Sequence, residues 1–157
     1  MRKGLTPATA LTLALCALAA PRAEAAAPCT PSPEANRQVV LQFYRQALTL
    51  RKPAEAFGRF VSADFVEHKP EVEKGTREAT AAHLEGLIRS MPDPRWEVLR
   101  TAAEAYLVFL HARFTPAPGA PAYAIADVFR LKDCKIAEHW DVVAPPPKDQ
   151  PNPNPRF

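Results

Sequence analysis

The stretch KIAEHWDVV, residues 135–143, places two carboxylates, an imidazole and an indole side by side in what reads as a β-strand. A strand with one solvated face would alternate apolar and polar residues, and this stretch does not. Because strand side chains alternate between two faces, His139 and Asp141 share one face, while Glu138 and Trp140 share the other. Only one of these pairs can face a common site unless a β-bulge intervenes, and the pattern leaves open which pair does.

Asp127 is a second candidate for acid–base chemistry, because it lies in the apolar stretch AIADVF, residues 124–129. A carboxylate in so apolar a strand is desolvated, which makes it a stronger base. Alternatively, its side chain turns outward or pairs with Arg113 or Arg130. Asp141 is the other candidate base, or else a strand-end residue whose carboxylate is held by backbone amides.

The four histidines lie on separate predicted elements. His111 contacts either a ligand or the core, and His83, on the apolar face of a helix, is expected to pack. None of the histidines has the H-x-x-x-H or H-E-x-x-H spacing of zinc sites, so we expect no metal. No glycine-rich phosphate loop, G-x-S-x-G elbow or Cys–His–Asn context supports a nucleotide enzyme or a covalent hydrolase.

The strands that carry these groups also carry aromatic residues suited to the wall of an apolar pocket for a ring-bearing ligand. These residues are Tyr106, Phe109, Tyr123, Phe129 and Trp140. Core packing must account for most of them.

The elements that position these residues are helices first and strands afterwards. A capped start at Ser32-Pro33-Glu34 opens a helix that ends before Pro53. A short helix follows over Ala54–Phe60, and a third runs from Gly75-Thr76 to Pro92. Between the last two helices, SADFVEHKP is too irregular for a helix, with Phe65, Val66 and His68 as its candidate inward residues.

Four strands are predicted at Arg95–Ala103, Ala105–Phe114, Ala122–Leu131 and Lys135–Val143. This order predicts an α+β domain with antiparallel pairing.

The first 25 residues have a basic start, an apolar run and an A-x-A motif ending at Ala25, which is the layout of a secretory signal peptide. The alternative is a membrane anchor, but the apolar run is shorter than the roughly 20 residues that a bilayer requires. Cleavage after Ala25 predicts a secreted or periplasmic protein with no membrane contact. It also lowers the net charge from +3 to about +1, so we expect no nucleic-acid partner.

Cleavage leaves two cysteines, Cys29 and Cys134. In an oxidising compartment they form a disulfide or stay as two free thiols. The expected organisation is a signal peptide over 1–25, a proline-rich linker over 26–33, one domain over 34–145 and a proline-rich disordered tail over 146–157.

This chain resembles the SnoaL-like polyketide cyclase branch of the nuclear transport factor 2-like superfamily. The matching residues are FVEHKP (65–70), Gly75, His111, ADVFRL (126–131) and KIAEHWDVV, within a resemblance that covers Asn36 to Pro145. The resemblance implies a cone-shaped α+β barrel. In it, a strongly curved, mainly antiparallel sheet of four strands wraps three helices and leaves a pocket at the open end.

In the cyclases, a pocket aspartate removes a proton next to a carbonyl without metal or cofactor. Together with the predicted signal peptide, the resemblance therefore implies an exported domain that binds a small apolar carbonyl compound and catalyses aldol cyclisation or isomerisation. Asp127 or Asp141 would be the base. His68, which lies in a segment that points into the cone in this family, would polarise the carbonyl or relay a proton; alternatively, it is a buried histidine held by a backbone carbonyl. His111, His139, Trp140, Tyr123 and Phe129 would contact the ligand.

The superfamily also contains members that only bind a ligand or form homodimers through the sheet, so a non-catalytic module is the alternative. Two residues depart from the family pattern. Lys69 stands where asparagine is usual, which places a cation near the pocket mouth, and Cys134 replaces a turn glycine.

Overall fold

The computed structural model describes Met1 and residues 30–157, so the predicted cleavage site and Cys29 lie outside the described residues. Within the described part, no helix has the length and hydrophobicity needed to cross a membrane. The helical elements are α1 (Pro33–Tyr44), the π-helical turn η1 (Arg45–Thr49), α2 (Pro53–Phe60), the 3-10 turn η2 (Glu73–Gly75) and α3 (Arg77–Ser90). The strands are β1 (Val61–Glu67), β2 (Arg95–Glu104), β3 (Leu107–Thr115), β4 (Tyr123–Lys132) and β5 (Lys135–Ala144).

The three predicted helices are confirmed, together with the signals that start them. The Ser32 hydroxyl accepts a hydrogen bond from the backbone N–H of Ala35 at 3.1 Å, and Pro33 occupies the first turn of α1. At the start of α3, the Thr76 hydroxyl accepts in the same way from Ala79. These caps satisfy backbone donors that have no partner within the helix.

The sheet has five strands in the order β1-β5-β4-β3-β2, so the predicted count of four is one short. The four predicted strands pair antiparallel, whereas β1 joins the edge of the sheet parallel to β5. The register between β1 and β5 shifts from Val61↔Ile136 to Val66↔Glu138, which places extra residues of β1 in a bulge. A bulge interrupts the alternation of side chains, so the segment lacks the sequence period by which strands are recognised.

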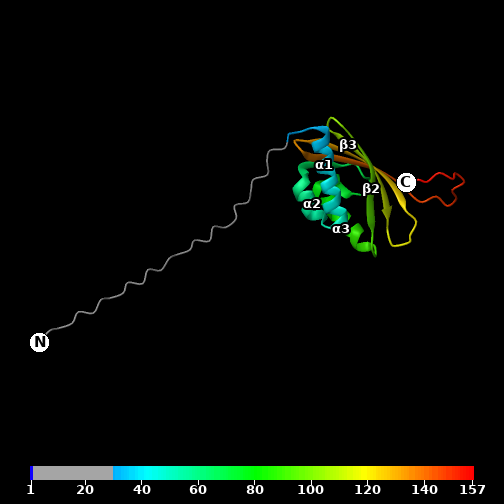
Figure 1. Cartoon of the computed structure of the whole chain (residues 1–157), viewed down its shortest axis with the longest axis horizontal. Helices are drawn as coiled ribbons and strands as arrows, with labels where there is room; N and C mark the ends of the chain where they lie inside the picture. Colours follow the sequence, from blue (N-terminus) through cyan, green and yellow to red (C-terminus); the bar gives the residue numbers. More distant parts are fainter. Residues whose placement is uncertain (2–29) are drawn as a thin grey trace.

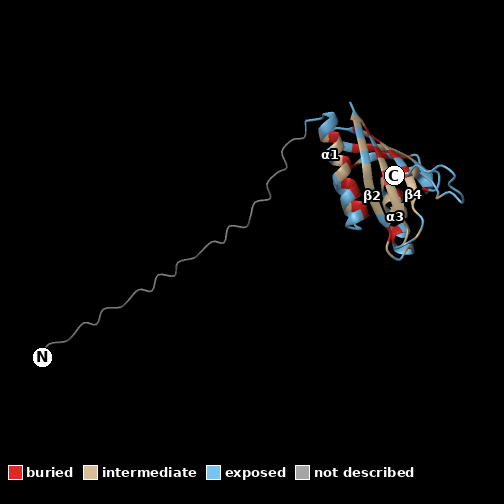
Figure 2. Ribbon diagram, turned by 45° about the vertical axis from the view of Figure 1, so that its right-hand side comes forward, coloured by how far each residue is buried: buried red, intermediate tan, exposed pale blue. Residues whose placement is uncertain are grey.

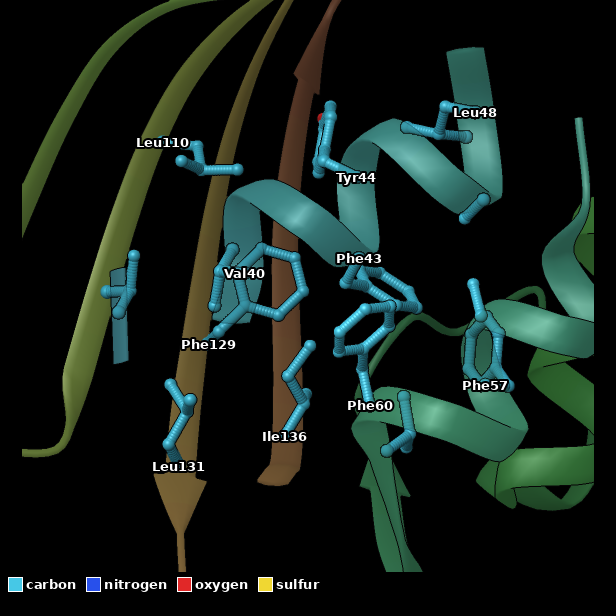
Figure 3. Packing of buried hydrophobic residues seen from close by; sticks show 14 of the residues in the cluster. Val40, Phe43, Tyr44, Leu48, Phe57, Phe60, Leu110, Phe129, Leu131 and Ile136 are labelled. Carbon is cyan, nitrogen blue, oxygen red and sulfur yellow. The ribbon is translucent and has the colours of Figure 1, made fainter. Parts of the chain in front are cut away.

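The helices pack against one face of the curved sheet (Figure 1), and buried residues follow the side of α1 that meets the strands (Figure 2). Figure 3 shows the resulting core, in which Val40 and Phe43 of α1 lie near Phe129 of β4 and Ile136 of β5. The Phe43 ring meets those of Phe57 and Phe129 edge-on, with ring centroids 5.1 and 6.1 Å away. This packing fixes α1 and β4 relative to each other, which matters because both contribute to the site.

The proline-rich tail is exposed over most of its length, as Figure 2 shows, but its last two residues contact the sheet. The Arg156 guanidinium donates to the backbone carbonyls of Ala122 and Ala144 at 3.3 and 3.2 Å. The Phe157 ring lies 4.5 Å from the Arg113 guanidinium. The end of the described chain therefore contacts β3, β5 and the residue before β4, whereas the sequence predicted a disordered tail over 146–157.

Candidate active site

Strand pairing brings the candidate acids and imidazole together. Asp127 of β4 stands opposite Asp141 of β5, and Phe129 stands opposite His139. On the other side of β5, His139 stands opposite Glu67 of β1. The alternation of side chains therefore places His139 and Asp141 on the helix-covered face, and Glu138 and Trp140 on the opposite face.

A cavity of about 510 Å³ lies between this face of the sheet and the helices. Its wall is mainly apolar, with Phe57, Phe65, Leu84 and Trp96 among its residues. Its polar lining residues are Tyr44, Glu67, Lys69, Glu71, Thr80, His83, Tyr123, Asp127, His139 and Asp141. A volume of this size accommodates a small organic molecule.

Four of these side chains form one continuous hydrogen-bonded network. The Tyr44 hydroxyl donates to Oδ2 of Asp127 at 2.6 Å, and His139 Nε2 lies 3.1 Å from Oδ1 of Asp127. On the far side of the imidazole, Nδ1 lies 2.9 Å from Oε1 of Glu67. The side chains of Asp127 and Glu67 are 6% and 1% exposed, so both carboxylates depend on these partners.

The two carboxylates keep His139 protonated. Burial opposes the positive charge of the imidazole, but the hydrogen bonds to Asp127 and Glu67 and the charges of both outweigh it and raise the pKa of His139 from 6.5 to about 10. Both ring nitrogens therefore donate at neutral pH. Burial and the neighbouring Asp127 carboxylate raise the pKa of Tyr44 well above its ordinary value of 10, so its hydroxyl stays a neutral donor.

Beside this network lies an ion pair between Lys69 and Asp141, with Nζ 2.6 Å from Oδ2. The Asp141 side chain is 13% exposed and that of Lys69 is 23% exposed, so the pair is partly shielded from water. The backbone N–H of Lys69 donates to Oε1 of Glu67 at 3.1 Å, which ties the loop after β1 to the network. The cation predicted near the pocket mouth thus lines the cavity and contacts a candidate base.

Five of the eight residues predicted to act on or bind a ligand line the cavity, and three do not. Those that line it are Asp127, Asp141, His139, Tyr123 and Phe129. His68, His111 and Trp140 are not among its lining residues.

The expectation that His68 points into the cone is corrected, because it follows Glu67, whose side chain takes the inward position at the end of β1. The His68 ring instead stacks on Trp140 with ring centroids 4.4 Å apart, and its Nε2 lies 3.4 Å from Glu138. These contacts place Trp140 with His68 on the opposite face of the sheet from the cavity.

His111 is also on that outer face. Its Nδ1 lies 3.0 Å from an Arg100 guanidinium nitrogen, and its ring stacks with Phe157 at 6.2 Å between ring centroids. His111 therefore lies outside both the cavity lining and the buried core.

Sequence reasoning did not assign Tyr44, Glu67 or His83 to the cavity. Tyr44 reads as one more apolar residue of the first helix, and Glu67 lies in the segment that was not recognised as a strand. His83 was expected only to pack, yet it lines the cavity and makes no hydrogen bond or ion pair with any residue in the range 30–157. The sequence offered one signal, a polar residue on an otherwise apolar face. That signal alone does not distinguish a residue of a functional site from a residue that packs in the core.

Cys134 forms a disulfide. Its predicted partner, Cys29, lies outside the described residues, so that pairing stays a prediction. Cys134 has a positive φ of 57° in the turn between β4 and β5, a conformation that glycine adopts without strain. Among the described residues, no group of three or more histidine, cysteine, aspartate or glutamate side chains is arranged to hold a metal ion.

A curved sheet around three helices, with an acid-lined cavity between them, defines an α+β protein of the nuclear transport factor 2-like fold. Residues 40–139 match the model of the SnoaL-like domain, and the chain belongs to this family. No curated protein matches the sequence.

Solved structures with the same fold carry different assignments. A candidate SnoaL-like polyketide cyclase from Jannaschia sp. is 18% identical, with a TM-score of 0.61 over 73% of this chain and 89% of that one. A candidate ketosteroid isomerase from Kribbella flavida is 16% identical, with a TM-score of 0.60 over 79% and 87%. AclR, a candidate hydroxylase from Streptomyces galilaeus, is 20% identical, with a TM-score of 0.60 over 71% and 90%. At these identities the likeness shows the fold alone.

Proposed function

We propose that the protein binds a small, mostly apolar carbonyl compound in its cavity and catalyses cofactor-free proton transfer on it. The observation that carries this proposal is the pairing of Asp141 with Lys69 in the wall of an otherwise apolar cavity. A carboxylate and an ammonium side by side provide a base for a C–H proton and a cation for the oxygen that becomes negative.

Asp141 is the better base of the two predicted aspartates. Asp127 has a hydrogen-bond partner on each carboxylate oxygen, Tyr44 on one and His139 on the other. Asp141 receives one hydrogen bond from the described residues, on Oδ2, so Oδ1 is left to accept a proton from a ligand. Asp127 then acts as a positioning residue, which with Glu67 fixes the ring of His139 beside the cavity.

The proposed reaction needs only these groups. Asp141 removes a proton from the carbon next to the carbonyl, and the Lys69 ammonium stabilises the oxygen of the resulting enolate. If Asp141 returns the proton to another carbon of the conjugated system, the product is an isomer. If the enolate carbon attacks a second carbonyl of the same molecule, a carbon–carbon bond forms and Asp141 protonates the new alkoxide, which completes an aldol cyclisation.

The first step can be tested without knowledge of the natural substrate. We would follow the exchange of the α-protons of 2-tetralone, a bicyclic ketone, by NMR in deuterated buffer. The protein is expected to accelerate exchange above the buffer rate, and Asp141→Asn to lower that acceleration by about 100-fold or more. Lys69→Met should lower it as well, since the enolate loses its cation.

Glu138→Gln is the matched control, because Glu138 lies on the same strand but faces away from the cavity and pairs with Arg130. It should exchange protons at the wild-type rate. Equal acceleration by the wild type and by an Asp127→Asn, Asp141→Asn double variant would refute the catalytic role of both aspartates.

We propose in addition that the protein is exported. The signal-like first 25 residues support this, and so does the disulfide at Cys134, because disulfides persist mainly in oxidising compartments. Expression of the full chain in a bacterium with a periplasm should yield a periplasmic protein that begins at Ala26. Recovery of the intact chain from the cytoplasm alone would contradict export.

One observation supports the alternative that the domain is a non-catalytic module that forms homodimers. Phe109, Val128 and Trp140 stand opposite one another across β3, β4 and β5 on the face away from the cavity. Phe109 is 41% exposed, and the nearby Val142 is 69% exposed. This apolar row suits a homodimer formed through the sheet, which sedimentation of the wild type against Val142→Lys would test. The expected result is a dimer that the substitution dissociates.

A further inference from the structure

The cavity carries an excess of negative charge. Its charged lining residues are the carboxylates of Glu67, Glu71, Asp127 and Asp141 and the cations of Lys69 and His139. Four negative and two positive groups leave a formal charge of −2. Glu71 is 65% exposed at the edge, whereas the other three carboxylates are nearly buried.

The sign of this charge does not depend on the protonation of either histidine. With His139 neutral, the sum is more negative, and with His83 protonated as well as His139 it is still negative. The buried charges also pair with one another: Asp127 and Glu67 pair with His139 inside the network, and Asp141 pairs with Lys69 beside it. Lys69 and His139 are therefore each neutralised by a carboxylate of this chain.

From this balance we infer that the ligand is uncharged or cationic, and that the cavity excludes carboxylates, sulfonates and phosphates. This inference rests on the proposed function, since it assumes that the cavity is where the ligand binds. An anion in the cavity would lose its hydration to mainly apolar walls and would meet a field of its own sign. Salt screens this repulsion little, because three of the four carboxylates, all except Glu71, are shielded from water.

Two fluorescent probes with the same anilinonaphthalene skeleton test the inference. N-phenyl-1-naphthylamine is neutral, and 1-anilinonaphthalene-8-sulfonate adds one negative charge. We expect the neutral probe to bind the protein at least about 10-fold more tightly than the sulfonate, from the size of charge repulsion at a partly buried site.

Two substitutions separate charge from size, because both keep the side chain close to its original volume. Asp141→Asn removes one negative charge and should strengthen sulfonate binding several-fold. Lys69→Met removes one positive charge and should weaken it. The ratio of sulfonate affinity to neutral-probe affinity, which corrects each variant for any change in the cavity itself, should therefore rise in Asp141→Asn and fall in Lys69→Met.

Three other outcomes would overturn either the inference or the proposed function. Equal or tighter binding of the sulfonate by the wild type overturns the inference while the proposed apolar cavity stands. Weak sulfonate binding that neither substitution changes means exclusion by size, which also overturns it. Failure of the neutral probe to bind overturns the proposed ligand-binding function itself, and the inference with it.

Discussion

Raising the pH through the alkaline range is expected to destabilise the protein, because folding holds a proton on His139. The folded pKa of about 10 exceeds the ordinary value of 6.5 that applies in the unfolded chain. Below pH 6.5 both states carry the proton and the stabilisation is complete. Between pH 6.5 and about 10 only the folded state carries it, so the free energy of unfolding falls by up to about 1.4 kcal/mol for each pH unit.

The total effect follows from the same two values. The interval between 6.5 and about 10 corresponds to roughly 5 kcal/mol, which is as large as the whole stability of many domains of this size. The source of this energy is the position of the imidazole between Asp127 and Glu67, 3.1 and 2.9 Å from their nearest oxygens. Deprotonation would remove the hydrogen bond that the imidazole donates to one of these two carboxylates, together with the charge attraction to both.

Urea unfolding at a series of pH values from 6 to 10 measures this loss directly, and the 15N shifts of the imidazole give the pKa of His139 in the folded protein. His83→Gln is the matched control, since His83 lines the same cavity but contacts neither carboxylate. It should keep the wild-type pH dependence. A free energy of unfolding that is constant from pH 6.5 to 9, or an imidazole that loses its proton near pH 6.5, would refute the reasoning.

Two further substitutions test the surroundings of the network. Tyr44→Phe removes the 2.6 Å hydrogen bond to the buried Asp127 carboxylate. In urea titrations it should lower the free energy of unfolding by about 1.5–3 kcal/mol. A change under about 0.5 kcal/mol would mean that this hydrogen bond does not stabilise the fold. Gly75→Ala should destabilise the protein by at least about 2 kcal/mol, because Gly75 has a φ of 55° and an added Cβ would lie 2.7 Å from the Glu67 carbonyl oxygen. Gly86→Ala, inside α3 with open space around the added Cβ, should instead stabilise by about 0.5–1 kcal/mol, so equal effects of the two glycine substitutions would contradict both arguments.

Local sequence signals account for much of the fold. The caps at Ser32 and Thr76 and the change of period after α3 predicted three helices and four antiparallel strands, all of which are present. Strand β1 was not predicted, since it has a bulge and its pairing partner β5 lies at the other end of the domain.

The residue types of the site could be predicted from the sequence, but the contacts between residues on different strands and helices could not. The period of β5 grouped His139 with Asp141, yet which face of a strand meets the helices depends on pairing with distant strands. Glu67 and His139 are 72 positions apart, and Tyr44 and Asp127 are 83 apart. No pattern within a short window of sequence can report such contacts.

The parallel pairing of β1 with β5 also bears on how the protein folds. Strands β2 to β5 follow one another in the sequence and pair as successive neighbours, so their contacts close short loops. Docking β1 closes a loop that spans most of the domain, which costs more chain entropy and is slow. We expect hydrogen-exchange protection during refolding to reach β2–β5 before β1. The Glu67–His139 contact, and with it the finished cavity, would then arise in the last step, so that a partly folded chain is unable to bind ligand and ligand binding stabilises only the completed fold.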